Sequence, residues 1–444
     1  MGRRCRLCED PEFPICYHSS RPARNHVNDV TNTASLGVEE ITPNSRAELE
    51  EPSPERLAQA VVSEGISLGF SRVGIASTEP LERGRERLEE FRRRGYADSL
   101  SYLASGDRHD PAQLLPGARS AVVALFAHGD PGVLPSDALV PRLRGSVARY
   151  ALGNDYHTLL KTRLFALARR IASLSGKRLR ARACVDTAPL LERELALRAG
   201  LGFQGKSTLL IAPGVGSYVL IGELLLDIEL APTRAVSAGC GSCRACLDAC
   251  PTRAFSEEYV LDARRCISFL TIEHEGEIPR ELRAPIGNRV FGCDVCQETC
   301  PFNASPARPA SSDLGRREAL LDPDLTELLN LGSAAYRRLV KRTALRRASR
   351  TTLQRNAAIA LGNSANPAAV AVLCQALHAH SDALVRVHVA WALGELAARL
   401  GGNEPAREAL ENARSRDSNA AVQAECEHAL SRFQSLSSTG SSAR

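Results

Sequence analysis

Hydrophobic and polar positions follow two different periods along residues 53–236. Residues 54–68 and 160–174 carry apolar side chains at helical spacing, with polar side chains opposite. Residues 120–127 and 217–228 are apolar runs rich in strand-forming residues. This mixture predicts a layered α/β (α+β) domain that covers residues 53–236.

Only helical patterns follow residue 312, and they repeat. Gln354–Gly362 and Arg386–Gly394 share the core Ala-x-Ala-Leu-Gly, and Val422–Leu430 echoes it. Such self-similarity is typical of α-helical HEAT-like repeats, in which each unit buries its apolar face against the next. We therefore expect a C-terminal repeat domain over residues 306–434, with an ordinary helical bundle as the alternative.

The two ends of the chain differ in composition from the rest. Residues 1–52 are rich in Arg, Glu, Ser, Pro and Asn and have few aromatic residues, so we expect a disordered extension. Residues 435–444 are expected to be a disordered tail. The extension contains a set of four candidate zinc ligands, although no core surrounds them: Cys5, Cys8, Cys16 and His18.

The whole chain has 444 residues, of which 44% are hydrophobic, enough for several domains with real cores. No run reaches the roughly 20 apolar residues that a membrane-spanning helix needs, and no apolar region follows the N-terminal charges. We therefore expect a cytoplasmic, monomeric protein without a membrane partner.

The net charge of +5 is modest for this length, so nucleic-acid affinity would depend on local clustering. No acidic residue lies between Glu327 and Asp382. The basic cluster within this stretch comprises Arg337, Arg338, Lys341, Arg342, Arg346, Arg347, Arg350 and Arg355. Such a cluster is typical of a phosphate-binding surface. The alternative is a solvated helix face, although such faces usually alternate in sign.

Eight cysteines between residues 237 and 305 have the spacing of iron-sulfur ligands. One run reads Cys240-x2-Cys243-x2-Cys246-x3-Cys250-Pro, and a second reads Cys293-x2-Cys296-x3-Cys300-Pro, with Cys266 between them. This is the bacterial ferredoxin pattern, in which the cysteine before the proline binds the other cluster. A pair of zinc sites is the alternative, but it does not explain the third close cysteine or the prolines.

The crossover assigns four cysteines to each of two 4Fe-4S clusters in a ferredoxin-like module over residues 237–305. The expected ligands are Cys240, Cys243, Cys246 and Cys300 for cluster 1, and Cys250, Cys266, Cys293 and Cys296 for cluster 2. Cys184, Cys374 and Cys426 lie in apolar surroundings, and we expect them to be buried packing residues.

Residues 200–207 fit the P-loop expression letter for letter. A P-loop follows a strand and opens a helix, so that backbone N–H groups and the helix dipole meet the phosphates. Here Leu190–Ala199 is predicted to be a helix and Thr208–Ala212 a strand, which is the reverse order. We therefore reject nucleotide hydrolysis for this loop.

Several motifs together resemble the epoxyqueuosine reductase family. They are Arg108-x-Asp110-Pro111, Ala148-Arg-Tyr-Ala151, Asp155-Tyr-His157, Asp186-Thr-Ala-Pro-Leu-Leu-Glu-Arg193, Gly202-x-x-Gly205-Lys206, both cysteine runs, and Cys266-Ile-Ser-Phe-Leu-Thr-Ile-Glu273. The resemblance implies a nitroreductase-like cobalamin-binding domain, a double 4Fe-4S ferredoxin module and a HEAT-like tail. It also implies cobalamin with its lower base detached, so the missing Asp-x-His-x-x-Gly motif is not an objection.

The resemblance implies reduction of epoxyqueuosine to queuosine at the wobble position of tRNA, with an external low-potential electron donor. The departing oxygen needs a proton, and Asp186 is the candidate general acid, with burial expected to raise its pKa. The alternative for Asp186 is a helix N-cap. The residues expected to line the corrin are Arg108, Arg149, Tyr150, Gly205, Lys206 and Ser268, and those expected to bind tRNA are Arg342, Arg346, Arg347 and Arg350.

Two other functions fit parts of the sequence. A corrinoid reductive dehalogenase would also pair cobalamin with two clusters, but Arg3-Arg4 lacks the apolar region of a twin-arginine export signal. A ferredoxin-type electron carrier with a helical interaction tail would use the clusters without cobalamin. Corrin absorption after reconstitution would distinguish an enzyme from a carrier.

Overall fold

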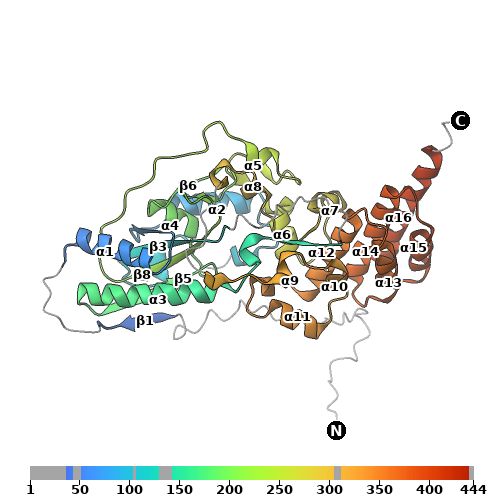
Figure 1. Ribbon diagram of the computed structural model, residues 1–444. Coiled ribbons are helices and arrows are strands. Elements are labelled where there is room, and N and C mark those ends of the chain that lie inside the picture. Colours follow the sequence, from blue (N-terminus) through green and yellow to red (C-terminus); the bar gives the residue numbers. More distant parts are fainter. Residues whose placement is uncertain (1–36, 44–51, 104–106, 130–142, 305–311, 440–444) are drawn as a thin grey trace, which may run out of the picture. The chain divides into compact units, whose positions relative to one another are not determined.

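A computed structural model describes residues 37–43, 52–103, 107–129, 143–304 and 312–439 (Figure 1). Its central element is a five-stranded sheet in which every neighbouring pair is antiparallel. The strands, in spatial order, are β1 (Val38–Ile41), β5 (Leu179–Cys184), β8 (Val219–Leu226), β3 (Ser120–Ala127) and β2 (Arg72–Ala76). The predicted strand over 120–127 is confirmed, and the one over 217–228 contains β8.

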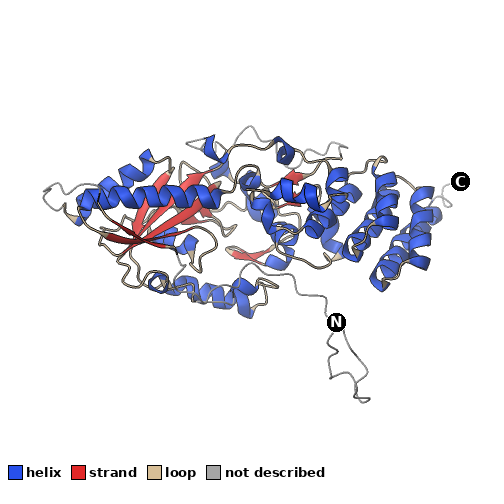
Figure 2. Cartoon of the chain, turned by 90° about the horizontal axis from the view of Figure 1, so that it is seen from below, coloured by secondary structure: helices blue, strands red, loops and turns tan. Residues whose placement is uncertain are grey.

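Helices cover both faces of this sheet (Figure 2). α1 (Pro54–Ser67) and α3 (Tyr156–Ser175) bury their apolar sides against one face, and α4 (Glu192–Arg198) packs on the other. Of the α3 stripe predicted from the sequence, Leu160, Leu164, Leu167 and Ile171 are fully buried, and Leu174 is partly buried. The α+β class expected for this part of the chain is confirmed.

The expected disordered extension is wrong for its last part, because residues 38–41 form strand β1. A free edge of β5 offers unpaired backbone groups, and β1 satisfies them in antiparallel register. Ile41 is buried, while Glu40 and Glu39 form ion pairs with Arg178 and Arg169. The candidate zinc ligands at Cys5, Cys8, Cys16 and His18 lie outside the described residues.

Residues 200–207, which fit the P-loop expression, include strand β6 (Phe203–Gln204), and the antiparallel strand β7 (Leu210–Ile211) follows them. Helix α4 ends just before this loop. A strand therefore follows the loop where a P-loop would have a helix, and the rejection of nucleotide hydrolysis at this loop agrees with the structure.

The cysteine-rich part of the chain contains short elements only. They are α5 (Ala245–Asp248), β9 (Phe255–Glu257), β10 (Val260–Leu261), α6 (Ile267–Ile272), α7 (Arg280–Ile286), β11 (Arg289–Phe291) and α8 (Val295–Glu298). β11 pairs in parallel with β4 (Ser146–Val147), which comes from the preceding domain. Backbone hydrogen bonds therefore join the two parts of the chain.

The C-terminal region is helical, as predicted. Its elements are α9 (Glu318–Leu321), α10 (Leu325–Leu329), α11 (Ser333–Val340), the short helix η8 (Ala344–Arg347), α12 (Arg350–Asn363), α13 (Ala369–Ala379), α14 (Ala383–Arg399), α15 (Glu404–Arg416) and α16 (Ala420–Thr439). Helix α16 continues five residues into the expected disordered tail, so that boundary was wrong.

The repeated Ala-x-Ala-Leu-Gly core places small residues where neighbouring repeat helices touch. A Cβ on Gly362 of α12 would lie 2.7 Å from the Ala392 backbone of α14, and one on Gly394 would meet Ala429 of α16. Glycine therefore permits the close approach of successive helices. This packing explains the repeated sequence.

The cysteine-rich part and the repeat helices share one apolar core that runs from Val147 to Leu430. Arg355 of α12 is fully buried and donates hydrogen bonds to the carbonyls of Leu270, His274 and Gly276. The expectation that Arg355 belongs to a phosphate-binding surface is therefore wrong. Its charge is satisfied by carbonyls of the cysteine-rich segment.

Within the described part of the chain, no helix combines the length and apolarity needed to cross a bilayer.

Candidate active site

A cavity of about 950 Å³ is lined by α2 (Glu82–Arg93), α4, the start of β8 and the cysteine-rich segment. Its walls are largely apolar, with contributions from Leu88, Phe91, Leu197, Val219, Ile221 and Phe269. Polar and charged side chains also line it, among them Tyr102, Arg108, Asp186, Glu192, Cys266 and Glu273. Apolar walls with a few convergent polar groups are the usual features of a small-molecule site.

Asp186 reaches this cavity from a turn at the end of β5. Its backbone has φ +57°, in the left-handed region that Asp tolerates better than most residues, and its N–H donates a 2.5 Å hydrogen bond to Glu192 Oε1. The side chain is 47% exposed, and its Oδ2 lies 3.3 Å from Nε2 of His157 and 4.0 Å from the guanidinium of Arg347.

The pKa of Asp186 is shifted in the direction opposite to the one predicted from the sequence. Burial opposes ionisation, but the hydrogen bond with His157 and the positive charges of Arg347, His157 and Arg108 hold the pKa of Asp186 below its usual value. The prediction that burial keeps this carboxyl protonated is therefore wrong in this arrangement. The N-cap alternative is wrong as well, because α4 begins at Glu192 and its N-cap residue is Leu191.

Among Asp155, His157 and Asp186, the side chain that carries a proton is His157. Burial disfavours the imidazolium, but hydrogen bonds with Asp155 and Asp186 raise the pKa of His157 to about 9. His157 Nδ1 lies 2.6 Å from Asp155 Oδ1, and Asp155 also caps the start of α3. Two carboxylates thus hold one imidazolium at the edge of the cavity.

Tyr102 connects the two sides of the cavity mouth. The guanidinium carbons of Arg108 and Arg347 lie 5.6 and 5.5 Å from the centre of its ring, within the range of cation–π attraction. Arg347 also forms an ion pair with Glu273, which lines the cavity. Arg347, expected to be a tRNA contact, does not itself line the cavity but contacts Tyr102, Asp186 and Glu273, which do.

The other arginines expected to bind tRNA differ in exposure and in their contacts. Arg346 and Arg342 are exposed, and Arg346 Nε is 3.4 Å from Asp155. Arg350 is half-buried at the start of α12 and donates to the Leu331 carbonyl. The structure thus places Arg342 and Arg346 at the surface beside the cavity.

The seven cysteines of the two runs and Cys266 between them lie close enough for their thiols to interact. The Cys300 thiol interacts electrostatically with Cys240 and Cys243, and Cys246 interacts with all three. Cys266 interacts with Cys250, and the Cys293 and Cys296 thiols both interact with Cys266. The Cys296 thiol also interacts with Cys246 of the other predicted set, so the division of the eight cysteines between two clusters stays a prediction.

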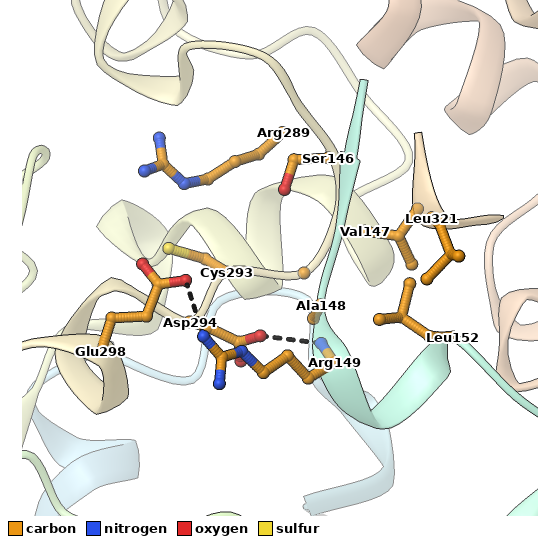
Figure 3. Close-up of a pocket in the computed structure, with 11 residues that line it drawn as sticks. Ser146, Val147, Ala148, Arg149, Leu152, Arg289, Cys293, Asp294, Glu298 and Leu321 are labelled. Atoms are coloured by element: carbon orange, nitrogen blue, oxygen red, sulfur yellow. Dashed lines mark hydrogen bonds and ion pairs between the residues drawn. The ribbon is translucent and has the colours of Figure 1, made fainter. Parts of the chain in front are cut away.

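Arg149 lies away from the large cavity, beside the second cysteine run (Figure 3). Its backbone N–H donates to Asp294 Oδ2 at 2.7 Å, its guanidinium is 3.8 Å from Glu298, and it covers the ring of Tyr218 at 4.7 Å. Arg149 therefore joins the α+β domain to α8, and the structure does not place it with the cavity-lining residues.

Four other residues expected to contact the corrin also do not line this cavity. Lys206 forms a 2.9 Å ion pair with Glu258, and a Cβ on Gly205 would lie 2.6 Å from the Ile211 side chain. Tyr150 packs edge-on against Tyr156, and Ser268 lies on α6 after Cys266. Of the six residues, only Arg108 lines the cavity.

The three remaining cysteines are packing residues to different degrees. Cys184 and Cys426 are buried, as expected, whereas Cys374 is only half-buried. Its thiol lies on α13, beside the carbonyl of Pro405. The expectation of full burial therefore fails for Cys374.

Comparisons with known proteins were made for the whole chain. Residues 108–187 match the family model described as "Epoxyqueuosine reductase QueG, DUF1730", residues 239–303 the "4Fe-4S double cluster binding domain", and residues 341–431 "HEAT repeats". Over 357 residues the chain is 41% identical to the epoxyqueuosine reductase of Pseudomonas aeruginosa, which covers 80% of this chain and 98% of that protein. The chain belongs to the epoxyqueuosine reductase family.

Solved structures of epoxyqueuosine reductases have the same fold. One, in complex with an epoxyqueuosine-modified tRNA stem loop, is 29% identical and has a TM-score of 0.77 over 85% of this chain and 99% of that chain. Another, from Bacillus subtilis, has a TM-score of 0.76 at 29% identity and the same coverage, and is described with its catalytic aspartate loop swung out of the active site. The family expected from the sequence is confirmed.

Sequence reasoning missed several residues of this epoxyqueuosine reductase site. Asp155 and His157 were noted only as a family motif, and their carboxylate–imidazole spacing of two residues was the available signal. Glu192 and Glu273 were likewise noted only within family motifs, and Tyr102 carried no signal of its own. Their roles depend on the fold, because each meets Asp186 or Arg347 from a different element.

Proposed function

We propose that this protein reduces epoxyqueuosine in tRNA to queuosine, the last step of queuosine synthesis. The reaction removes the epoxide oxygen with two electrons and two protons, giving a cyclopentene ring and water. The observation that carries this proposal is that Asp186 and Cys266 line the same cavity. A proton source and an expected cluster ligand therefore face one substrate-sized space.

The eight cysteines fit two 4Fe-4S clusters as a donor set. Cys240, Cys243, Cys246 and Cys300 are the proposed ligands of cluster 1, and Cys250, Cys266, Cys293 and Cys296 those of cluster 2. Burial raises the pKa of the Cys293 thiol to about 12, and it also raises the pKa values of Cys266 and Cys300. Such thiols become stable thiolates only when positive iron compensates their charge.

The large cavity fits cobalamin. Its volume and apolar walls suit a large macrocycle, and the buried Nε of Arg108 has no hydrogen-bond partner among the described residues. Arg108 would therefore donate to an amide arm of the corrin, with Tyr102 beside it. When bound, the clusters pass single electrons, and cobalamin holds them at low potential next to the substrate.

The chain's own residues would hold and deliver the proton that the leaving oxygen needs. In the described arrangement His157 holds it at Nε2, next to the ionised Asp186. We place Asp186 between His157 and the substrate, so that the proton passes through its carboxyl to the departing oxygen. Asp155 would keep the imidazole oriented and favour its charged form.

Arg342, Arg346 and Arg350 are the proposed phosphate contacts, with Arg347 between them and the cavity. Exposed guanidiniums beside the site would bind the anticodon arm through its backbone while the modified base enters the cavity. An external low-potential donor would reduce the clusters. We further propose that the protein acts as a monomer in the cytoplasm.

The decisive experiment is mass spectrometry of tRNA nucleosides from a strain that lacks this gene. Epoxyqueuosine should accumulate and queuosine should disappear, and the wild-type gene should restore queuosine where the Asp186→Asn gene does not. Normal queuosine in the deletion strain would contradict the proposal.

A further inference from the structure

A second carboxyl lies beneath the cavity floor, in the middle of the sheet. Glu223 is a residue of β8, paired with Val123 on one neighbour and Cys184 on the other, and its side chain is fully buried. Neither of its oxygens receives a hydrogen bond from any N–H or hydroxyl of the described residues. A buried carboxylate without donors is very unfavourable, so Glu223 is expected to be protonated.

The group that faces Glu223 is another carboxyl, Glu192, in the first turn of α4. Glu192 lines the cavity, and its Oε1 accepts the N–H of Asp186 at 2.5 Å. Two carboxylates in contact cannot both be ionised, so one proton between them removes the repulsion.

The arginines near Glu192 and Glu223 donate hydrogen bonds to backbone carbonyls, so they do not take the place of the proton between the two carboxyls. Arg182 donates to the Leu114 carbonyl, Arg193 to the Thr208 carbonyl and Arg108 to the Tyr102 carbonyl. The remaining titratable groups that face the pair are Asp186, Cys184 and Tyr156. The negative charge of Asp186 raises the pKa of both glutamates further, in addition to burial, and brings that of Glu192 to about 7.

We propose that Glu192 and Glu223 share one proton and act as a latch that holds Asp186 in the active site. Protonated Glu223 donates to Glu192, and the Glu192 carboxylate holds the backbone N–H of Asp186 in its left-handed conformation. Both are positioning residues, and this inference rests on the proposed role of Asp186. The latch accounts for a strained turn whose backbone is fixed by a side chain six residues further along the chain.

Hydrogen exchange of the Asp186 amide tests the latch without substrate. The anaerobically reconstituted full-length protein would be compared with Glu192→Ala, Glu223→Leu and Glu223→Gln. We expect the amide to exchange at least about tenfold faster in Glu192→Ala and Glu223→Leu. Glu223→Gln should behave like the wild type, because its amide N–H can replace the donor O–H of the acid.

An unchanged exchange rate in Glu192→Ala would overturn the latch. So would fast exchange in Glu223→Gln, since it would mean that an ionised Glu223 is needed. If Glu223→Leu does not fold, the other two variants still decide the matter.

Infrared spectroscopy tests the shared proton directly. The wild type at neutral pH should show the carbonyl stretch of a buried carboxylic acid, which should persist in Asp186→Asn and disappear in Glu223→Gln. Absence of this band in the wild type would refute proton sharing.

Turnover measurements then distinguish a positioning role of Glu192 from an effect on folding. Glu192→Ala should lower kcat at an unchanged KM for tRNA and alter its pH profile near neutrality, whereas Glu223→Gln should retain kcat. A change in KM at an unchanged kcat would argue against a positioning role for Glu192. The exchange and infrared results do not depend on the substrate, so they stand even if the proposed reaction is wrong.

Discussion

Nε2 of His157 lies 3.3 Å from Oδ2 of Asp186, and the same imidazole lies 2.6 Å from Asp155 through its other nitrogen. The imidazolium is therefore favoured from both sides, and Asp186 is ionised because of it. We therefore expect proton delivery at this site to depend on the pair of residues, since neither side chain alone has the pKa of a neutral-pH acid.

The first prediction concerns stability against pH. The pKa of His157 is about 9 in the folded protein, above its ordinary value of about 6.5, so its contribution is complete below pH 6.5 and disappears as pH rises through 9. His157→Gln should lower the free energy of unfolding by about 1–2 kcal/mol at pH 6. This figure is kept small because Asp186 is half-exposed, so solvent screens its interaction with His157. The difference should vanish near pH 9.5.

Thermal unfolding midpoints between pH 6 and 9.5 measure this effect. His128→Gln is the control, because burial lowers the pKa of His128 to about 4 and the residue stays neutral throughout the range. Because the unfolded chain protonates this histidine near pH 6.5 while the folded protein does not, His128→Gln should destabilise the protein less at pH 6 than at pH 9.5. His157→Gln should show the opposite trend, and a destabilisation that does not grow toward pH 6 would contradict its assigned charge.

The second prediction is that Asp186→Asn retains the cofactors and tRNA affinity but loses turnover by about 100-fold or more, because an amide cannot pass a proton to the leaving oxygen. Single-turnover rates with epoxyqueuosine-containing tRNA measure it. Asp322→Asn, at an exposed site where the side chain is far from the cavity lining, should be unaffected. A loss below about tenfold would leave Asp186 with a structural role.

The third prediction concerns the cluster crossover. The wild type should bind about eight irons, and Cys250→Ser should lose cluster 2 although it lies in the first run. Cys300→Ser should damage cluster 1 instead. Iron analysis and electron paramagnetic resonance distinguish the two, and Cys374→Ser should keep the full iron content. Loss of cluster 1 alone in Cys250→Ser would disprove the crossover.

The fourth prediction concerns tRNA binding. Arg342→Glu with Arg346→Glu should raise the apparent KM for tRNA and reduce the salt slope of binding by about 2, because two phosphate contacts are lost. Cluster content should not change. Arg416→Glu on α15, an exposed arginine outside the basic cluster, is the matched control. Wild-type affinity of the double variant at low salt would move the tRNA site elsewhere.

The sequence predicted the elements whose apolar pattern matches their packing. The helices over 54–68 and 160–174 and the strand over 120–127 agree with the structure because each buries one continuous face. Strand β1 was missed because four residues in a polar stretch carry no period. Its stability comes from the edge of β5, which only the fold creates.

The candidate site was predictable where ligands are close in sequence. The cysteine spacing predicts eight cluster ligands within a segment that matches a double 4Fe-4S cluster domain. Arg355 could not be distinguished from its exposed neighbours, since its burial depends on carbonyls some 80 positions earlier. The pKa of Asp186 was wrongly predicted for the same reason. His157 and Arg347 reach it from elements distant in sequence.

The hydrogen bonds of α12 limit how this protein could recombine with its relatives. Arg355 and Asn356 hold the carbonyls of Leu270, Thr271 and Val290, which lie between two predicted ligands of cluster 2. A chimaera that exchanged residues 341–431 alone would place foreign side chains against this backbone. Gene fusions should therefore be viable only when the segment from Asp262 to Phe291 and the repeat helices come from the same parent.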